Sequence, residues 1–98
     1  MSKRYCIQLT LHSGQGIECF AKFTLGNDKE FAASLFRQLK GNRDVNEKDL
    51  VHMEFIELSD DLPLSIDLVA CTLNDIGENS KIITRELFKS KLLSITVD

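Results

Sequence analysis

The chain has 98 residues, the length of one domain, and we expect a single domain over residues 1–98. Hydrophobic residues make up 43% and charged residues 28%, which excludes a disordered or fibrous protein. Twelve Lys and Arg against 15 Asp and Glu give a net charge of −3, which disfavours nucleic acid and anionic membranes as partners. The longest apolar run, residues 68–71, is too short to cross a bilayer.

The cysteines bear on the cellular compartment. Cys6, Cys19 and Cys71 are too few and too scattered for a disulfide framework. The basic residues at the N-terminus are followed by alternating residues, not by the apolar block of a secretory signal. We therefore expect a reduced, cytoplasmic protein.

The first predicted elements are two strands, over residues 5–11 and 17–25, in which apolar residues alternate. The turn residues between them predict an antiparallel hairpin. A three-residue loop, residues 14–16, places both apolar sets on one face, whereas a four-residue loop does not. We therefore expect that loop, with Gly16 at positive φ. The expected pairs are Ser13 with Ile17, Leu11 with Cys19, Leu9 with Ala21, and Ile7 with Phe23.

A helix is predicted next, between Asn27 and Gly41. Asn27 is a good N-cap residue, and Glu30 completes a pattern like a capping box. Gly41 is a typical C-terminal stop. One apolar stripe follows the helical period, and it consists of Phe31, Ala32, Leu35, Phe36 and Leu39.

A second hairpin is predicted from a strand over residues 50–59, a turn over 60–63 and a strand over 64–71. The first of these strands should place Val51, Met53 and Phe55 on one face and His52, Glu54, Ile56 and Leu58 on the other. The second should bury Leu64, Ile66, Leu68 and Ala70.

The C-terminal part predicts helix in two pieces. Thr72 and Asp75 are typical of the cap of a short helix, and a second stretch begins at about Thr84, with Leu87, Phe88 and Leu92 on one side. The conformation of residues 93–98 stays open. The whole pattern predicts an α+β two-layer sandwich: a four-stranded, mainly antiparallel sheet with helices on one face, in the order β-β-α-β-β-α.

Few residues point to chemistry. The expected registers place His52 opposite Cys71 on the helix-free face, near Glu54 and Asp67, where the imidazole could deprotonate the thiol. An enzyme or small-molecule site around His52 and Cys71 is therefore one hypothesis. His12 opposite Glu18 predicts only a surface ion pair. No metal-ligand spacing, phosphate loop or nucleophile motif is present, so no metal, cofactor or catalytic residue is assigned.

The helix-free face of the sheet carries more apolar residues than a solvent-exposed face needs. The candidate interface consists of Phe20, Ile56, Leu58, Val69 and Thr10. The leading hypothesis is a non-catalytic interaction module that forms a homodimer through this face or through a sheet edge. Another protein is the alternative partner.

Charge is unevenly distributed along the chain. Residues 1–53, 54–80 and 81–98 carry net charges of +2, −7 and +2, which sum to −3. Lys81, Arg85 and Lys89 recur every four residues, which predicts either a solvated helix face or a basic stripe that meets the acidic hairpin of another copy. Nucleic-acid binding through this stripe is the least favoured function, because aromatic residues are not interleaved with it.

Overall fold

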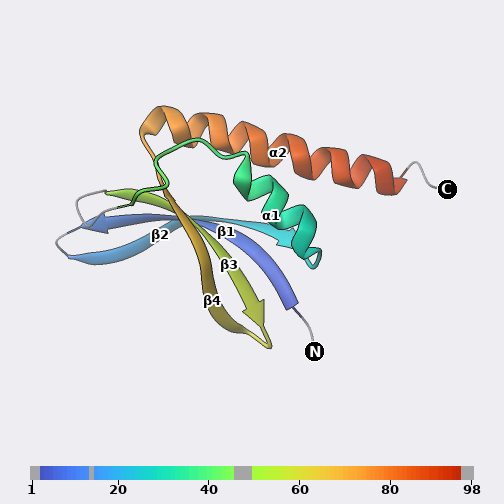
Figure 1. Ribbon diagram of the computed structural model, residues 1–98, viewed down its shortest axis with the longest axis horizontal. Coiled ribbons are helices and arrows are strands. Elements are labelled where there is room, and N and C mark those ends of the chain that lie inside the picture. Colours follow the sequence, from blue (N-terminus) through green and yellow to red (C-terminus); the bar gives the residue numbers. More distant parts are fainter. Residues whose placement is uncertain (1–2, 14, 46–49, 96–98) are drawn as a thin grey trace.

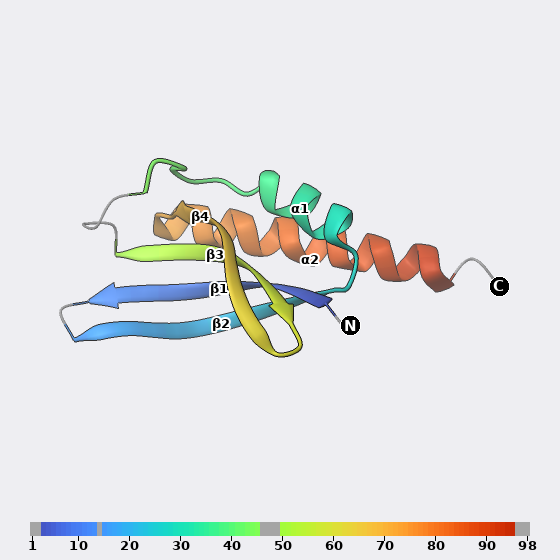
Figure 2. The same cartoon turned by 60° about the horizontal axis from the view of Figure 1, so that its bottom comes forward.

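The computed structural model describes residues 3–13, 15–45 and 50–95, with side chains up to Lys91. Its elements are β1 (Lys3–Ser13), β2 (Gly16–Gly26), α1 (Lys29–Arg37), β3 (Val51–Ser59), β4 (Leu62–Ala70) and α2 (Leu73–Ile95). The strands form one sheet in the order β2-β1-β3-β4, and every neighbouring pair is antiparallel. Both helices cover the same face (Figures 1 and 2), which confirms the predicted α+β fold.

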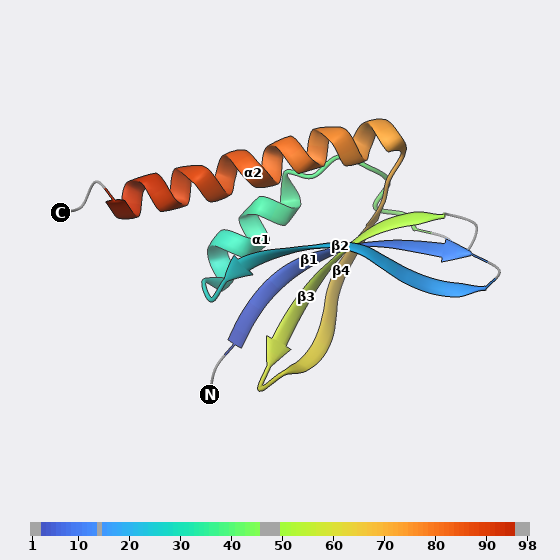
Figure 3. The ribbon, with the colours of Figure 1, turned by 180° about the vertical axis from the view of Figure 1, so that it is seen from behind.

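The molecule is elongated, at 51 × 32 × 21 Å. Its radius of gyration is 14.0 Å, against about 13 Å for a typical domain of 100 residues. Two features account for this shape in Figures 1 and 3: the β3–β4 hairpin bends away from the helices, and the C-terminal half of α2 extends beyond the sheet. Neither helix in the described ranges is both long and apolar enough to cross a bilayer.

The hairpin of β1 and β2 corrects the predicted loop. Leu9 pairs with Ala21 and Ile7 with Phe23, as predicted. Near the turn, however, Ser13 pairs with Gly16, Leu11 with Glu18, and His12 with Ile17. A bulge at Phe20 inserts one extra residue into β2. This residue, and not the length of the loop, brings the apolar residues of the two strands back onto the same face. Gly16 does adopt a positive φ, of 121°.

Helix α1 starts one residue later than predicted and ends earlier. Its N-cap is Asp28, not Asn27, and the Asp28 side chain accepts hydrogen bonds from the backbone N–H groups of Glu30 and Phe31. The helix ends at Arg37, so Gly41 lies in the following loop. The predicted apolar stripe does enter the core, where Leu35 and Phe36 are fully buried.

Strand β4 differs most from its prediction. It begins at Leu62 and includes Pro63, because the turn consists of Asp60 and Asp61 alone. Of the four residues predicted to be buried, Leu64 and Ile66 are exposed, and only Ala70 is fully buried. Val69 lies under the helices at 0% exposure, which corrects its predicted place on the helix-free face.

The Asp60-Asp61 turn holds two residues in the left-handed region, with φ of 51° and 68°. This geometry favours Asn and Gly at the two positions. The double substitution Asp60→Asn, Asp61→Gly is therefore expected to raise the free energy of unfolding by about 1 kcal/mol, measured by urea denaturation. Asp28→Asn, at a cap where both residue types are accepted, should change it much less. A destabilised turn variant would contradict the turn geometry.

Helix α2 is continuous, which corrects the two predicted pieces. It starts with the predicted capping box: the Thr72 side chain accepts from Asp75 N (3.1 Å), and the Asp75 side chain accepts from Thr72 N (3.0 Å). Gly77 sits in the helix with open space around it and does not break it.

Three backbone segments meet where α2 crosses the loop after α1. Asn79 is fully buried; its side-chain amide accepts from Lys40 N (2.6 Å) and donates to Lys40 O (2.9 Å). Asn42 then pairs with Ala70 through two backbone hydrogen bonds of 2.8 and 2.9 Å. The guanidinium of Arg43 donates to carbonyl oxygens at the C-terminal end of α1 and lies 5.0 Å above the Phe36 ring. These contacts fix the loop against β4.

Candidate functional site

The predicted pair of His52 and Cys71 does not form one site. His52 pairs with Ala70, and Cys71 comes after the end of β4. The Cys71 side chain packs against the core beneath the helices, with its sulfur 3.6 Å from Asn79 Nδ2. His52 points to the other side of the sheet, since its neighbour Met53 is in the same core. The strand therefore separates the imidazole from the thiol.

The environment of Cys71 also disfavours a nucleophilic role. Burial raises the pKa of its thiol, and the negative charge of Asp75 raises it further. Burial likewise raises the pKa of the Cys6 thiol. Both thiols are therefore protonated at neutral pH, whereas the thiolate is the reactive form.

A thiol reagent tests this assignment. At neutral pH we expect one fast-reacting cysteine, the exposed Cys19, and two slow ones, Cys6 and Cys71. The rate at Cys71 should rise steeply as the pH increases through the alkaline range, because its thiol ionises later than usual. In Cys19→Ser the fast phase should disappear. Modification of Cys71 as fast as that of Cys19 at neutral pH would contradict the protected site.

His52 instead lies beside His12. Their rings are 4.2 Å apart between centroids and meet edge to face, and Thr10 Oγ1 is 3.4 Å from His12 Nε2. His12 is opposite Ile17, so the predicted ion pair with Glu18 is wrong. Nowhere in the described part of the chain do three or more His, Cys, Asp or Glu side chains form a group that could hold a metal ion. The two rings serve as packing on this face of the sheet.

Glu57 is the buried acid of the described residues. Its carboxylate accepts a hydrogen bond from Tyr5 OH (3.1 Å) and lies 3.9 Å from Lys29 Nζ and 4.0 Å from Lys3 Nζ. Burial and this hydrogen bond raise the pKa of Tyr5. The carboxylate therefore links β1, β3 and the start of α1 at this end of the sheet.

The predicted interface on the helix-free face is only partly present. Thr10 and Ile56 are buried there at 5% exposure, Leu58 is half-buried, and Val69 belongs to the opposite face. Phe20 alone is largely exposed, at 60%, and it is the extra residue of the β2 bulge. Thr10, Phe20, Ile56, Leu58 and Val69 therefore do not make one continuous exposed patch.

Among the residues whose side chains are described, three exposed apolar ones lie together on the outer strand β4. Leu62, Leu64 and Ile66 are 72%, 58% and 40% exposed, and they alternate along an edge of the sheet. We call these three residues, with the adjoining Asp60 and Asp61, the β4 edge surface. In the sequence, this surface is marked by apolar residues that alternate along β4 without a Lys or Arg between them. Such alternation predicts burial, and that prediction is wrong for Leu64 and Ile66.

A groove of about 210 Å³ continues the β4 edge surface toward α1. Ile66, Asp67 and Arg37 line its rim, and the buried rings of Phe36 and Phe55 form its floor. Asp67 is 3.8 Å from the Arg43 guanidinium. Apolar surface with a charged rim is typical of a protein contact.

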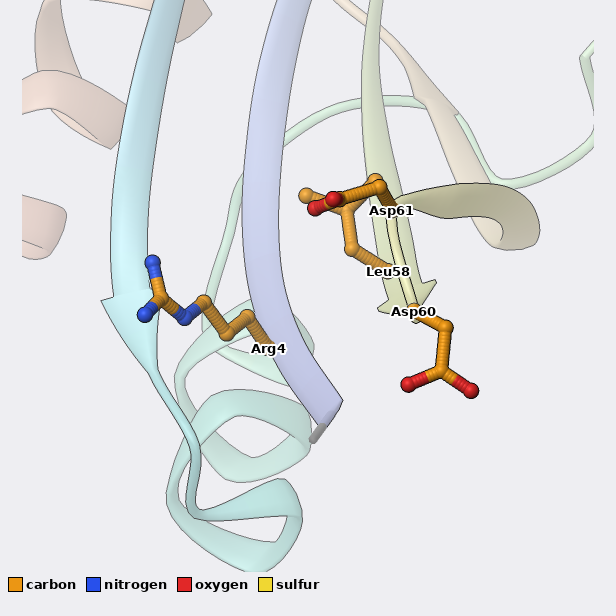
Figure 4. Close-up of a pocket in the computed structure, with 4 residues that line it drawn as sticks. All are labelled: Arg4, Leu58, Asp60 and Asp61. Atoms are coloured by element: carbon orange, nitrogen blue, oxygen red, sulfur yellow. The ribbon is translucent and has the colours of Figure 1, made fainter. Parts of the chain in front are cut away.

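A second hollow, of about 310 Å³, lies between the turn of the β3–β4 hairpin and the start of β1 (Figure 4). Arg4, Leu58, Asp60 and Asp61 line it. The Arg4 side chain extends toward β2, away from the Asp60 carboxylate. Because these charged groups do not converge, the hollow lacks the geometry of a catalytic site.

Comparison of the chain with known protein families, with curated proteins and with solved structures found no match.

Proposed function

We propose that this protein is a non-catalytic interaction module that self-associates through the β4 edge surface. The observation that carries the proposal is the run of exposed residues from Leu62 to Asp67, with three large aliphatic side chains among them. Exposed edges of this kind bind other chains unless they are blocked. Covering the aliphatic side chains would provide the free energy of association.

The opposite edge of the sheet is a weaker candidate. Strand β2 exposes Ile17 and Phe20, but charged residues, Glu18 and Lys22, are interleaved with them. Interleaved charges are one way in which sheet edges avoid contact. The β4 edge also adjoins an apolar groove, which extends the surface that a partner can cover.

Light scattering coupled to gel filtration tests the proposal. We expect the full chain to elute with a mass above the 11.1 kDa of one copy. Leu64→Lys should return it to that mass, because an ammonium group cannot be buried at the contact without a large desolvation cost. Leu73→Lys is the matched control, since Leu73 is 82% exposed outside this surface, and its mass should equal that of the wild type. Association unaffected by Leu64→Lys would contradict the β4 edge surface.

A further inference from the structure

The outer face of α2 presents an aromatic residue among cations. Phe88 is 62% exposed, and its nine-residue spacing from the buried Asn79, at 3.6 residues per turn, places it on the opposite side of the helix. Leu87, predicted to share a side of the helix with Phe88, is half-buried and lines the same hollow as Phe88. Folding of one chain therefore does not explain Phe88.

Residues three, four and seven positions from Phe88 share a helix face with it. Among the residues whose side chains the structure describes, these are Lys81, Thr84, Arg85 and Lys91, and three of the four are basic. We call these four residues with Phe88 the basic face of α2. Glu86 lies 3.3 Å from Arg85 and 3.6 Å from Lys89, so it offsets part of this charge, while Lys81 and Lys91 are exposed. Thr84, Leu87, Phe88 and Lys91 line an open, mainly apolar hollow of about 180 Å³.

From this complementarity we infer that the β4 edge surface of one copy binds the basic face of α2 on a second copy. This inference rests on the self-association proposed above and names the partner surface. Apolar side chains would meet Phe88 and its hollow, while Asp60 and Asp61 would face the lysines. Four strand steps from Leu62 to Ile66 span about 13 Å, and ten helix steps from Lys81 to Lys91 span about 15 Å, so the two surfaces match in length.

Direct pairing of two β4 strands explains the surface less well. Pro63 has no N–H to donate, and a bulge at Ile66 interrupts the hydrogen-bonding edge. An antiparallel pair centred on Leu64 would also place Asp61 opposite Asp67 of the other copy, since both lie three residues from the centre. Like charges directly opposite each other are destabilising. Binding of a helix to β4 would use side-chain contacts only, so it would not need free backbone N–H and C=O groups on the strand.

The two surfaces cannot meet within one molecule. Figures 1 and 3 show the hairpin end and the projecting half of α2 diverging from each other, so they lie well apart. Each copy therefore offers one acidic, apolar edge and one basic helix face. A contact between unlike surfaces is head to tail, and it forms rings or open chains unless two copies make both contacts with each other.

A mixing experiment tests this arrangement. Leu64→Lys alters the edge and keeps the helix face, whereas Phe88→Glu alters the helix face and keeps the edge. Each variant alone should have the mass of one copy, 11.1 kDa, in light scattering. An equimolar mixture should form a 1:1 complex of twice that mass, because one intact edge and one intact helix face remain. High salt should weaken the complex.

Phe20→Glu is the matched control, because Phe20 is also exposed, at 60%, but lies on β2 outside both surfaces. The mass of this variant should equal that of the wild type. Circular dichroism and thermal melting identify any variant that fails to fold. If Phe88→Glu fails to fold, the double variant Lys81→Glu, Lys91→Glu takes its place in the experiment. If the wild type is always a single copy, the proposed self-association is wrong. If Leu64→Lys abolishes association but Phe88→Glu does not, or if the mixture of two monomeric variants stays monomeric, only the head-to-tail contact is wrong.

Discussion

Replacing Gly41 with alanine is expected to lower the free energy of unfolding by about 2–4 kcal/mol. Gly41 has a φ of 139°, a region that residues with a side chain rarely adopt. A methyl group there would overlap the carbonyl oxygen of Ala70 and lie 2.6 Å from Val69 Cγ2. Relief would require the loop to move away from β4, which breaks the backbone pairing of Asn42 with Ala70.

For the matched control, Gly77→Ala, we expect a change in the free energy of unfolding of opposite sign. Gly77 lies inside α2 with nothing within 4 Å of the position a methyl group would take. Gly77→Ala should therefore raise the free energy of unfolding by about 0.5–1 kcal/mol, because alanine loses less backbone entropy in a helix. Urea denaturation of both variants measures the difference. A Gly41→Ala protein as stable as the wild type would show that the loop does not pack against β4 in this way.

Asn79→Ala is expected to cost about 2–3 kcal/mol, since it leaves the N–H and C=O of Lys40 without their side-chain partner. The same amide donates toward the sulfur atoms of Met53 and Cys71, at 3.5 and 3.6 Å. Asn74→Ala, at an exposed position of the same helix, is the control and should change stability by less than about 0.5 kcal/mol.

The isosteric change Asn79→Asp adds a pH dependence. The new carboxylate would be buried and would face the Lys40 carbonyl oxygen, so burial should raise its pKa in the folded state. A raised pKa means that the folded state binds the proton more tightly than the unfolded state does. The destabilisation should therefore be smallest below the unfolded value of about 3.9 and should grow as the pH rises through the folded value. A deficit independent of pH would contradict the buried amide.

The sequence predicted the fold because each strand and helix has its own periodic pattern. Met53 and Phe55 lie in one core with the apolar stripe of α1, as their spacing requires. The errors arose where a local irregularity changes the pattern. The bulge at Phe20 restores alternation inside β2, which loop length alone cannot indicate.

The candidate site was harder to predict, because exposure depends on where the helices end above the sheet. Leu64 and Ile66 alternate as buried residues do, yet the hairpin bends away from the helices and leaves them exposed. His52 and Cys71 are separated for another reason: His52 pairs with Ala70, and the Cys71 thiol lies beneath the helices, on the opposite side of the sheet from the imidazole. The charge pattern carried over better: three acids of the hairpin and the three residues of the predicted basic stripe are exposed, namely Asp60, Asp61, Asp67, Lys81, Arg85 and Lys89.

Sedimentation equilibrium of the wild-type chain over a range of micromolar concentrations tests the central claim most directly. Self-association through the β4 edge surface predicts a weight-average mass that rises with concentration above the 11.1 kDa of one copy. The rise should be absent in Leu64→Lys and present in Leu73→Lys. A wild-type mass of 11.1 kDa at every concentration would contradict the claim.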